Sequence, residues 1–425
     1  MTISTERRCR HCGGPFTATL ASLGEMPIAN DYVDPSSAPP SDPRTELTVV
    51  VCGDCRLAQT LDFKRSAELF RADYAYFSSA SSAWVDHARR YVEAMVERFA
   101  LPAGARHVEL ASNDGYLLQF AKAKGLSVLG VEPCRSVAQA ASALDIETRI
   151  DFFSQAYAAR LVEEGWRADL VTANNVFAHI PDVNDFARGI RDLLKPQGVA
   201  TIEVQHLLRL IQRNQFDTIY HEHFSYYSLF AAKRVFEAAG LRLFDVEELD
   251  THGGSLRYFV CRAEADHVET LAVARVLQEE LAYGIDTDAL YDGFAERIAA
   301  VRQGFRDLLL RLKAEGATVA GYGAPAKGVT LLNFCDVGPD LIAFTVDKAA
   351  SKQGRLIPGV RIPIMPPEAL AEHRPDYVVI LPWNLKDEII EQIQAAGDWA
   401  PAFITAIPEP SILDSLTNGR QRHVA

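Results

Sequence analysis

Short apolar runs alternate with amphipathic stretches through the middle of the chain, which is the pattern of a parallel sheet covered by helices. The stretches 116–124 and 229–239 have helical spacing, as does the segment 84–99 that precedes the first run. A further strand is expected just before Asp151. The apolar runs span residues 107–111, 127–131, 169–173, 200–205, 242–248 and 255–261. We therefore expect an α/β core with one continuous sheet.

The last third of the chain has a similar pattern. Apolar residues recur at helical spacing from residue 290 to residue 312, so a long helix is expected to bridge the two parts. A glycine-rich turn at 321–328 follows the first apolar run, and a helical stretch at 329–334 comes next. The runs that predict strands here are 318–322, 341–346, 376–381 and 402–406. They indicate a second, smaller Rossmann-like unit.

The amino-terminal segment is organised differently. Residues 35–43 are rich in proline and serine and predict a loop, and residues 47–51 predict a strand. The fold class expected is therefore α/β, with three parts. These are a small amino-terminal module at 1–72, a Rossmann-like core at 73–263, and a helical bridge with a carboxy-terminal α/β unit at 264–425.

Composition places the chain among ordinary globular proteins. Of its 425 residues, 48% are hydrophobic and 23% are charged. The formal net charge of −13 argues against nucleic acid or an anionic membrane as a partner, because both select basic surfaces. The start of the chain lacks the apolar core of a signal peptide, and no later apolar run is long enough to span a bilayer. We expect a cytoplasmic monomer.

Four of the seven cysteines form two CxxC pairs. Each pair can form a turn that points two thiolates at one ion, so Cys9, Cys12, Cys52 and Cys55 predict a four-cysteine zinc site. Four thiolates leave no open coordination position, and the ion is therefore expected to be structural rather than catalytic. A redox CxxC would not need a second copy. His11, inside the first pair, could replace a cysteine but is not needed.

Polar residues follow the strands of the core where a nucleoside would lie. An acidic residue after the second strand can accept both ribose hydroxyls, while the turn after the first strand lets backbone approach closely. That turn holds one glycine and is not GxGxxG, which argues against NAD and favours S-adenosylmethionine, a cofactor without phosphates. The candidate cofactor residues are Ser112, Asn113, Asp114, Gly115, Glu132, Asp151, Phe152 and Asn174.

The order of these features resembles class I methyltransferases. An acidic-glycine turn follows strand one, acids follow strands two and three, and His179-Ile180 follows strand four. An LLKPxG turn at 193–198 precedes strand five. The resemblance implies a class I, Rossmann-like fold that binds S-adenosylmethionine.

One stretch after the fifth strand gathers two imidazoles, a carboxylate and three phenols. It reads YHEHFSYY over residues 220–227, and we interpret it as an acid/base centre. The loop after strand five reaches the position where the acceptor sits in such folds. If the backbone is extended, Tyr220, Glu222 and Phe224 face one way, and His221 and His223 face the other. A metal site formed by the two histidines is the rival interpretation.

Further motifs extend the resemblance over essentially the whole chain. The four-cysteine module, a Tyr- and Ser-rich segment at 74–82, the turn at 112–115, the YHEH run and an HGGS motif at 252–255 come in a characteristic order. A looser glycine-lysine loop at 323–328 follows. This order is similar to that of the nucleotide-sugar C-methyltransferases of deoxysugar biosynthesis. The resemblance implies methyl transfer to C-3 of a dTDP-linked 4-keto hexose, with a carboxy-terminal domain that helps to hold the nucleotide sugar.

The resemblance also implies roles for single residues. A carbon beside a ketone becomes nucleophilic only after losing its proton, so the site needs a base and a group that stabilises the enolate oxygen. His223 is the implied base, and Tyr220, Glu222 and His179 orient it or hydrogen-bond the keto group. His221 has no assigned role. The residues expected to contact the nucleotide sugar are Tyr76, Ser79, His252, Gly323, Lys327 and Lys352.

Two other functions stay open on the sequence. An O- or N-methyltransferase acting on a sugar or another small molecule would need no carbanion. The other is a non-enzymatic zinc-module adaptor or an NAD-binding protein, which would respond to NAD rather than to S-adenosylmethionine.

Overall fold

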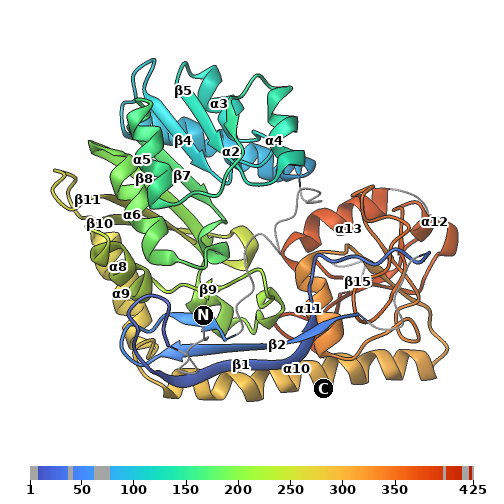
Figure 1. Ribbon diagram of the computed structural model, residues 1–425. Coiled ribbons are helices and arrows are strands. Elements are labelled where there is room, and N and C mark those ends of the chain that lie inside the picture. The colour runs from blue at the N-terminus through green and yellow to red at the C-terminus, as the bar shows by residue number, and fades with distance from the viewer. Residues whose placement is uncertain (1–7, 37–41, 62–76, 396–398, 414–420, 424–425) are drawn as a thin grey trace.

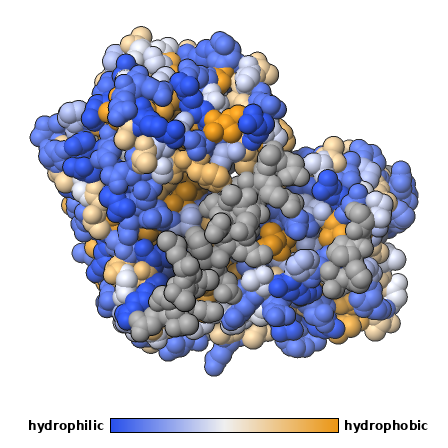
Figure 2. Space-filling view, viewed as in Figure 1, coloured by the Kyte–Doolittle hydropathy of each residue, from blue (hydrophilic) through white to orange (hydrophobic). Residues whose placement is uncertain are grey.

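The computed structural model describes residues 8–36, 42–61, 77–395, 399–413 and 421–423. Two α/β lobes stand side by side, and the helix α10 (Ala289–Ala314) runs along their base together with the ribbon of β1 and β2 (Figure 1). Hydrophilic residues cover most of the face seen in Figure 2, with apolar residues gathered in patches. No helix within the described ranges is both long enough and apolar enough to cross a membrane.

The amino-terminal sheet is antiparallel and has the order β1-β2-β3-β9. Its last strand comes from the YHEHFSYY stretch, because Gln59 pairs with Ser225 and Ala58 with Tyr226. The predicted strand at 47–51 lies inside β2. The strands are β1 (Phe16–Pro27), β2 (Arg44–Cys52), β3 (Ala58–Thr60) and β9 (Ser225–Tyr226). The pairing of β3 with β9 joins the amino-terminal module directly to the segment that carries the histidines.

The central sheet has the order β10-β11-β8-β7-β4-β5-β6, and all neighbours are parallel except β11, which is antiparallel to β8 and β10. Its inner strands are apolar runs because helices cover both faces. Residues of α5, α6, α8 and α9 form the core on one face, and residues of α2, α3 and α4 form it on the other. The strands are β4 (Arg106–Leu110), β5 (Ser127–Val131), β6 (Thr148–Arg149), β7 (Ala168–Asn174), β8 (Leu194–Gln205), β10 (Leu241–Leu249) and β11 (Ser255–Arg262). The helices are α2 (Ser82–Arg98), α3 (Leu118–Ala123), α4 (Arg135–Ser142), α5 (Gln155–Glu163), α6 (Val183–Leu193), α7 (Leu207–Gln212), α8 (Leu229–Ala238) and α9 (Leu271–Ala282).

The carboxy-terminal sheet has the order β14-β13-β12-β15-β16-β17-β18 and is parallel up to β16. The second Rossmann-like unit is thus confirmed. Its strands are β12 (Val319–Tyr322), β13 (Thr345–Val346), β14 (Ile364–Met365), β15 (Tyr377–Ile380), β16 (Ala402–Thr405), β17 (Ser411–Leu413) and β18 (Gln421–His423). Its helices are α11 (Ala326–Phe334), α12 (Ala369–His373) and α13 (Lys386–Ala395).

Short 3-10 helices connect several of these elements. They are η1 (Ser78–Ala80), η2 (Phe177–His179), η3 (Phe216–Thr218), η4 (Thr251–Gly253) and η5 (Trp383–Leu385). Three predicted elements differ from the structure. The turn expected at 193–198 falls mostly within β8, which begins at Leu194. The strand expected at 341–346 is only the two-residue β13, and the helix expected at 329–334 begins at Ala326, so Lys327 lies in its first turn.

One hydrophobic core joins the amino-terminal sheet to the carboxy-terminal unit. It contains β1 and β2 residues, the apolar face of α10, and α11. Phe216, Ile219 and Tyr226, around the YHEH run, belong to the same core. The amino-terminal module is therefore packed into the rest of the molecule rather than attached by a linker.

Candidate active site and metal centre

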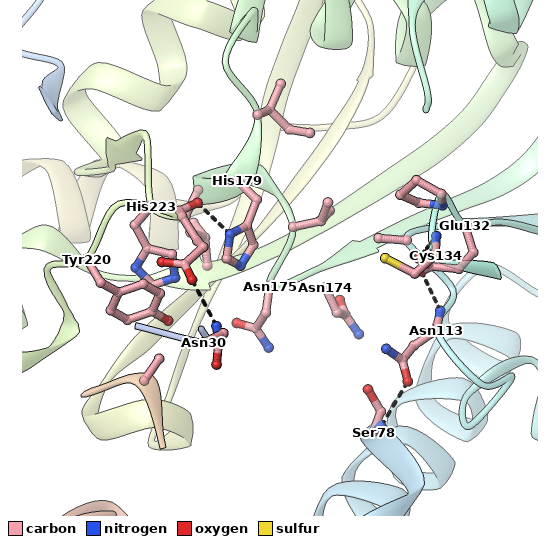
Figure 3. A pocket seen from close by; sticks show the side chains of 18 of the residues that line it. Asn30, Ser78, Asn113, Glu132, Cys134, Asn174, Asn175, His179, Tyr220 and His223 are labelled. Carbon is pink, nitrogen blue, oxygen red and sulfur yellow. Dashed lines mark hydrogen bonds between the residues drawn. The ribbon is translucent and has the colours of Figure 1, made fainter. Parts of the chain in front are cut away.

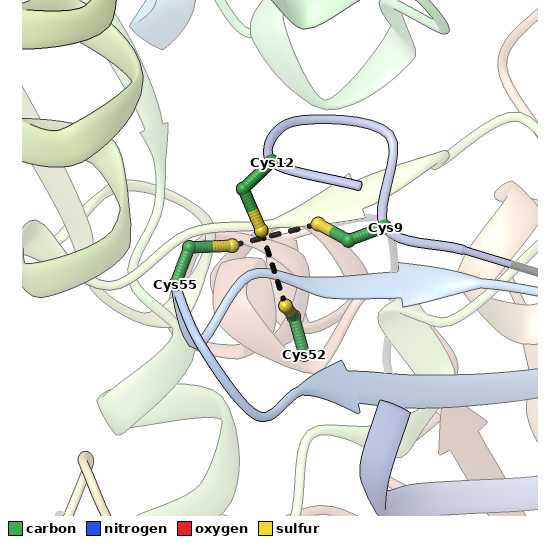
Figure 4. A group of neighbouring side chains, drawn as sticks. All are labelled: Cys9, Cys12, Cys52 and Cys55. Carbon is green, nitrogen blue, oxygen red and sulfur yellow. Dashed lines mark hydrogen bonds between the residues drawn. The ribbon is translucent and has the colours of Figure 1, made fainter. Parts of the chain in front are cut away.

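Four cysteines converge at the edge of the amino-terminal sheet (Figure 4). Their ligand atoms all lie within 4.8 Å of one another, with 3.5 Å between the Sγ atoms of Cys9 and Cys55 and 3.4 Å between those of Cys12 and Cys52. A tetrahedral site with zinc–sulfur bonds of about 2.3 Å places its sulfurs about 3.8 Å apart, so the cluster has the dimensions of a zinc site. Gln59 donates Nε2–H to the Cys9 sulfur at 3.2 Å, as expected for a thiolate ligand.

His11 is not needed as a ligand here. Its Nδ1 lies 2.7 Å from Oδ1 of Asn184, which ties the metal-binding turn to the start of α6. The four-cysteine prediction therefore fits without a substitute ligand.

A cavity of about 1180 Å³ opens between the carboxyl ends of the central strands, the amino-terminal sheet and α11. Figure 3 shows its two ends, with Tyr220, His223 and His179 at one and Glu132 and Asn113 at the other. Asn174 and Asn175, at the end of β7, lie between them. The cavity is larger than the 300–1,000 Å³ typical of a single small-molecule site, so it has room for two ligands.

The YHEH run forms a turn rather than an extended strand. The N–H of His223 donates to the carbonyl of Tyr220 at 2.9 Å, and the two ring centroids are 4.0 Å apart. The alternation expected for an extended backbone is therefore wrong, and Tyr220 and His223 lie together on the cavity wall. His179, from η2, approaches the same ring at 4.7 Å between centroids.

Backbone carbonyls fix the orientation of both cavity histidines. Nδ1–H of His223 donates to the Thr218 carbonyl at 2.9 Å, and Nδ1–H of His179 donates to the Glu222 carbonyl at 2.6 Å. In neutral imidazole the other nitrogen, Nε2, is then a proton acceptor. Burial lowers the pKa of His179 to about 4 and holds the pKa of His223 well below its usual range. Both rings are thus neutral near pH 7, the protonation state that a general base requires.

The other two members of the run have different surroundings. Glu222 is buried and accepts a hydrogen bond from Asn30 Nδ2 at 3.1 Å, and burial raises the pKa of its carboxyl. His221 places Nε2 3.2 Å from the Thr45 carbonyl, in the amino-terminal sheet. His221 and His223 are thus held by carbonyls of different segments, and within the described residues the four cysteines are the only group of three or more His, Cys, Asp or Glu side chains placed to hold a metal.

The other end of the cavity is acidic. Glu132 accepts from the backbone N–H of Asn113 at 3.0 Å and of Cys134 at 2.8 Å. Burial raises the pKa of the Glu109 carboxyl, at the end of β4, well above its usual value, and the nearby Asp114 and Glu132 raise it further. Within the described ranges no salt bridge joins these three carboxylates to a basic side chain. Buried carboxylates without a cation favour a positively charged ligand.

Unpaired polar atoms mark the same end. Oε2 of Glu109, Oδ1 of Asp114 and both side-chain polar atoms of Asn174 are buried without a hydrogen-bond partner in the described structure. Of these residues only Asn174 lines the cavity, where a bound ligand could pair with its amide, and Glu132 presents a carboxylate beside it. The donor set therefore fits S-adenosylmethionine, whose sulfonium and ammonium groups are cationic.

Of the remaining cofactor candidates, one lines the cavity and the others lie outside it. Phe152 lines the cavity, but Asp151 pairs with Arg160 at 3.0 Å and is not among the lining residues. Ser112 is buried under Gly130, where a Cβ would come within 2.3 Å of its Oγ. Gly115 adopts φ +79°, which suits glycine in this turn.

The serine segment before α2 reaches the cofactor turn through its backbone. The N–H of Ser78 donates to Asn113 Oδ1 at 2.9 Å, and the N–H of Ser79 donates to Asp114 Oδ2 at 3.1 Å. Ser78 lines the cavity and Ser79 does not. Tyr76 lies outside the described residues.

Basic residues of the carboxy-terminal unit line the cavity opposite the acidic end. Lys327 donates to Asn384 Oδ1 at 2.7 Å, and Lys352 donates to the Ala324 carbonyl at 2.9 Å. Arg355 lines the same wall. Gly323 does not line the cavity, and its φ of +86° is the left-handed conformation that this turn requires. The Ala324 N–H donates to the Asp347 carboxylate at 2.7 Å and is not available to a ligand. The lysines, rather than the backbone N–H groups of the glycine-rich turn, therefore offer positive charge to the cavity.

His252 is held in an unusual backbone conformation on the cavity wall. It has φ +54°, and its ring lies 5.4 Å from that of Trp84. Burial lowers the pKa of His252 to about 4. The next residue, Gly253, packs so closely on Trp383 that a Cβ would come within 2.3 Å of it. This loop therefore carries His252 to the junction of the two lobes.

Several lining residues were missed by the sequence analysis. Asn30, Tyr32, Trp84 and Arg355 line the cavity, but each comes from a segment without a recognisable motif. Glu109 does not line the cavity but lies near Glu132, and a carboxylate within an apolar strand was a signal that could have found it.

Three family models match consecutive parts of the chain. One described as "Putative zinc binding domain" matches residues 9–70, one described as "Methyltransferase domain" matches 84–246, and one described as "C-methyltransferase C-terminal domain" matches 250–408. C-methyltransferase NovU of Streptomyces niveus is 39% identical over 407 residues, which cover 96% of this chain and 97% of the relative.

Solved structures of S-adenosylmethionine-dependent methyltransferases are similar to part of the chain. One from Clostridium acetobutylicum is 13% identical with a TM-score of 0.33, and covers 46% of this chain and 94% of its own. One from Mesorhizobium loti is 15% identical with a TM-score of 0.32, and covers 41% and 99%. At such TM-scores the likeness carries no weight beside the sequence matches.

Proposed function

Because the chain belongs to the S-adenosylmethionine-dependent C-methyltransferases with an amino-terminal zinc domain, we propose that its acceptor is a nucleotide-linked 4-keto deoxysugar, methylated on a carbon beside the ketone. Family membership decides for C-methyl transfer over transfer to oxygen or nitrogen and over a non-enzymatic role. The four-cysteine site holds one structural zinc.

The opposite charges of the two cavity ends are the observation that carries the proposal. Glu132 lines one end, with Asp114 and Glu109 buried close to it, and Lys327 and Lys352 line the other. A cationic methyl donor suits the first end, and an anionic diphosphate suits the second. A neutral or cationic acceptor would leave the lysines without a partner in the ligand.

The cofactor residues that we propose are those at the acidic end. Glu132 would accept the ribose hydroxyls, since its two N–H donors hold the carboxylate in place and leave lone pairs free. Phe152 would pack on adenine, and Asn113 and Asn174 would hydrogen-bond the amino-acid part. S-adenosylmethionine would supply, when bound, a methyl group that the carbon nucleophile accepts as the sulfonium sulfur leaves in S-adenosylhomocysteine.

We propose His223 as the base that creates this nucleophile. Its Nε2 is the acceptor nitrogen, and the ring is neutral because burial disfavours its charged form. It takes the proton from the carbon beside the ketone, and the electron pair moves to the carbonyl oxygen as an enolate. Tyr220, in ring contact with His223, is placed to donate to that oxygen, and His179, whose N–H is taken by the Glu222 carbonyl, is placed to orient the base.

The position of the methylated carbon is the finest part of the proposal. C-3 is proposed on the family resemblance described above. C-5 also lies beside a C-4 ketone, so proton abstraction by His223 is chemically open to both carbons.

A panel of nucleotide sugars tests the acceptor. Purified protein would be incubated with S-adenosylmethionine and dTDP- or UDP-linked 4-keto and 3-amino-4-keto hexoses, with the matching 4-hydroxy sugars as controls. Mass spectrometry should show a methyl gain on a 4-keto compound, and NMR should locate it at C-3. A methyl gain at C-5 would correct the position, and a gain on the 4-hydroxy controls alone would contradict the proposal.

A further inference from the structure

Arg10 lies between a zinc ligand and the histidine turn. It directly follows Cys9, and its guanidinium donates to the Phe224 carbonyl at 2.5 Å and to the Thr60 carbonyl at 2.6 Å. The guanidinium also lies 5.6 Å from the centre of the Phe224 ring. Phe224 is the residue after His223, so one side chain joins the metal-binding turn to the active-site turn.

Phe224 connects the histidine turn to two other segments through backbone hydrogen bonds. Its N–H donates to the Ala178 carbonyl at 2.7 Å, and Ala178 precedes His179. Its carbonyl accepts from Thr60 N–H at 3.1 Å as well as from Arg10. The side chain is fully buried. A shift of Phe224 would therefore move both the His223 turn and the η2 segment that carries His179.

Gln59 makes a second connection along the same path. Its side chain donates to the Cys9 sulfur at 3.2 Å and accepts from the Arg10 N–H at 3.0 Å. Its backbone pairs with Ser225, two residues after His223. Metal ligands are commonly oriented by such outer-shell partners, and here the partner is also a rung of the sheet that ends at the active site.

We propose that Arg10 is a positioning residue through which the zinc site fixes the His223–Phe224 turn for catalysis. The proposal rests on the proposed role of His223. Only a planar guanidinium offers two donors at the angle needed to reach the Phe224 and Thr60 carbonyls together. The zinc is thus required for the geometry of the base as well as for the stability of the module.

The competing explanation is that Arg10 merely stabilises the amino-terminal module. Two features keep the explanations separable. The Phe224 carbonyl also accepts from the Thr60 N–H, and the pairing of β3 with β9 does not use the Arg10 side chain, so both are expected to remain when Arg10 is shortened. Arg56 is a matched control, because it directly follows the zinc ligand Cys55 and forms an ion pair with Asp288, away from the histidine turn.

The test compares Arg10→Met, Arg10→Lys, Arg56→Met and His223→Ala in the full chain. Zinc content, the Kd for S-adenosylhomocysteine, and kcat and KM with a dTDP-linked 4-keto deoxyhexose would be measured. Arg10→Met should keep one zinc per chain and a Kd within about twofold, while kcat falls about tenfold to a hundredfold, since a displacement of about 1 Å near the chemistry has an effect of that size. Arg10→Lys should fall between Arg10→Met and the wild type, and Arg56→Met should match the wild type.

Each other outcome has a definite meaning. An unchanged kcat in Arg10→Met, or an equal loss in Arg56→Met, would overturn the positioning role. Loss of zinc in both Arg10 variants would also overturn it, because Arg10 would then hold the metal site rather than the turn. If Arg10→Met lost zinc alone, a reduced kcat in zinc-replete Arg10→Lys would support the role and a wild-type kcat would overturn it. Full activity in His223→Ala would instead refute the base on which the proposal rests.

Discussion

The two Rossmann-like units share one hydrogen-bond pattern and differ in charge. Glu132 follows β5 in the central unit, and Asp347 follows β13 in the carboxy-terminal unit. Each carboxylate accepts one N–H from the turn after the neighbouring strand and another from the residue two positions on, at distances from 2.7 to 3.0 Å. The same local geometry has therefore formed twice in the chain.

The surroundings of the two acids are opposite. The Lys352 ammonium lies 3.6 Å from Asp347 and reaches the adjacent Ala324 carbonyl, which the Tyr32 hydroxyl also contacts. Glu132 has no such cation within the described residues and lies near two further carboxylates. A Rossmann-like turn with a following acid thus does not by itself identify a nucleoside site. The charge around the acid distinguishes a site for a cationic cofactor from a wall that offers positive charge to an anionic ligand.

The largest effect on this comparison is expected from neutralising the two acids in turn. Glu132→Gln should raise the Kd for S-adenosylhomocysteine about tenfold to a hundredfold, because hydrogen bonds to a charged group are worth about 1.5–3 kcal/mol. Asp347→Asn should change it less than about twofold. Isothermal titration calorimetry would measure both, and equal effects would remove the distinction between the units.

A smaller effect is expected from the basic wall. Lys327→Met should raise the KM for the nucleotide sugar about tenfold while leaving the Kd for S-adenosylhomocysteine unchanged, since it removes one charged contact to a diphosphate. Lys348→Met is the matched control, because Lys348 is exposed and does not line the cavity. A change in the Kd for S-adenosylhomocysteine without a change in the KM for the nucleotide sugar would contradict the assignment of Lys327 to the nucleotide sugar.

The smallest effect concerns the loss of folding stability at low pH, which should arise mainly in the central unit. The pKa values of His179 and His252 are lowered from 6.5 to about 4, mainly by burial. The unfolded chain then binds protons below pH 6.5 that the folded chain does not bind, so stability is present above pH 6.5 and is lost as pH falls toward 4. His179 alone should cost about 2 kcal/mol of stability by pH 5.

Thermal unfolding between pH 7.5 and 5 would measure this loss. His179→Asn should make the melting temperature less dependent on pH. An unchanged slope in His179→Asn would contradict the neutral, buried state assigned to that ring.

The sequence predicted what local pattern determines. The apolar runs anticipated the strands of the central sheet and β12, β13, β15 and β16 of the carboxy-terminal one, but not β14, β17 and β18. The two CxxC pairs anticipated the cysteine cluster. Pairing between distant segments was not predictable, because β9 has only two residues and its partner β3 has three. That pairing, with the turn at Tyr220, brings Tyr220 and His223 to the same wall, which an alternating pattern would not.

Asp151 shows the same limit from the other side. Its position after the third strand matched the pattern of a cofactor contact. In the structure its carboxylate forms an ion pair with the exposed Arg160 of α5. Which side chain an acid pairs with depends on the packing of neighbouring helices, and the order of motifs along the chain does not contain it.

The most direct test of the account is proton exchange without methyl transfer. A dTDP-linked 4-keto deoxyhexose would be incubated in deuterated water with the protein and S-adenosylhomocysteine, and deuterium at the carbons beside the ketone would be followed by NMR. The wild type should exchange one such proton, and His223→Ala should lose this exchange while binding S-adenosylhomocysteine normally. Undiminished exchange in His223→Ala would contradict the assignment of His223 as the base.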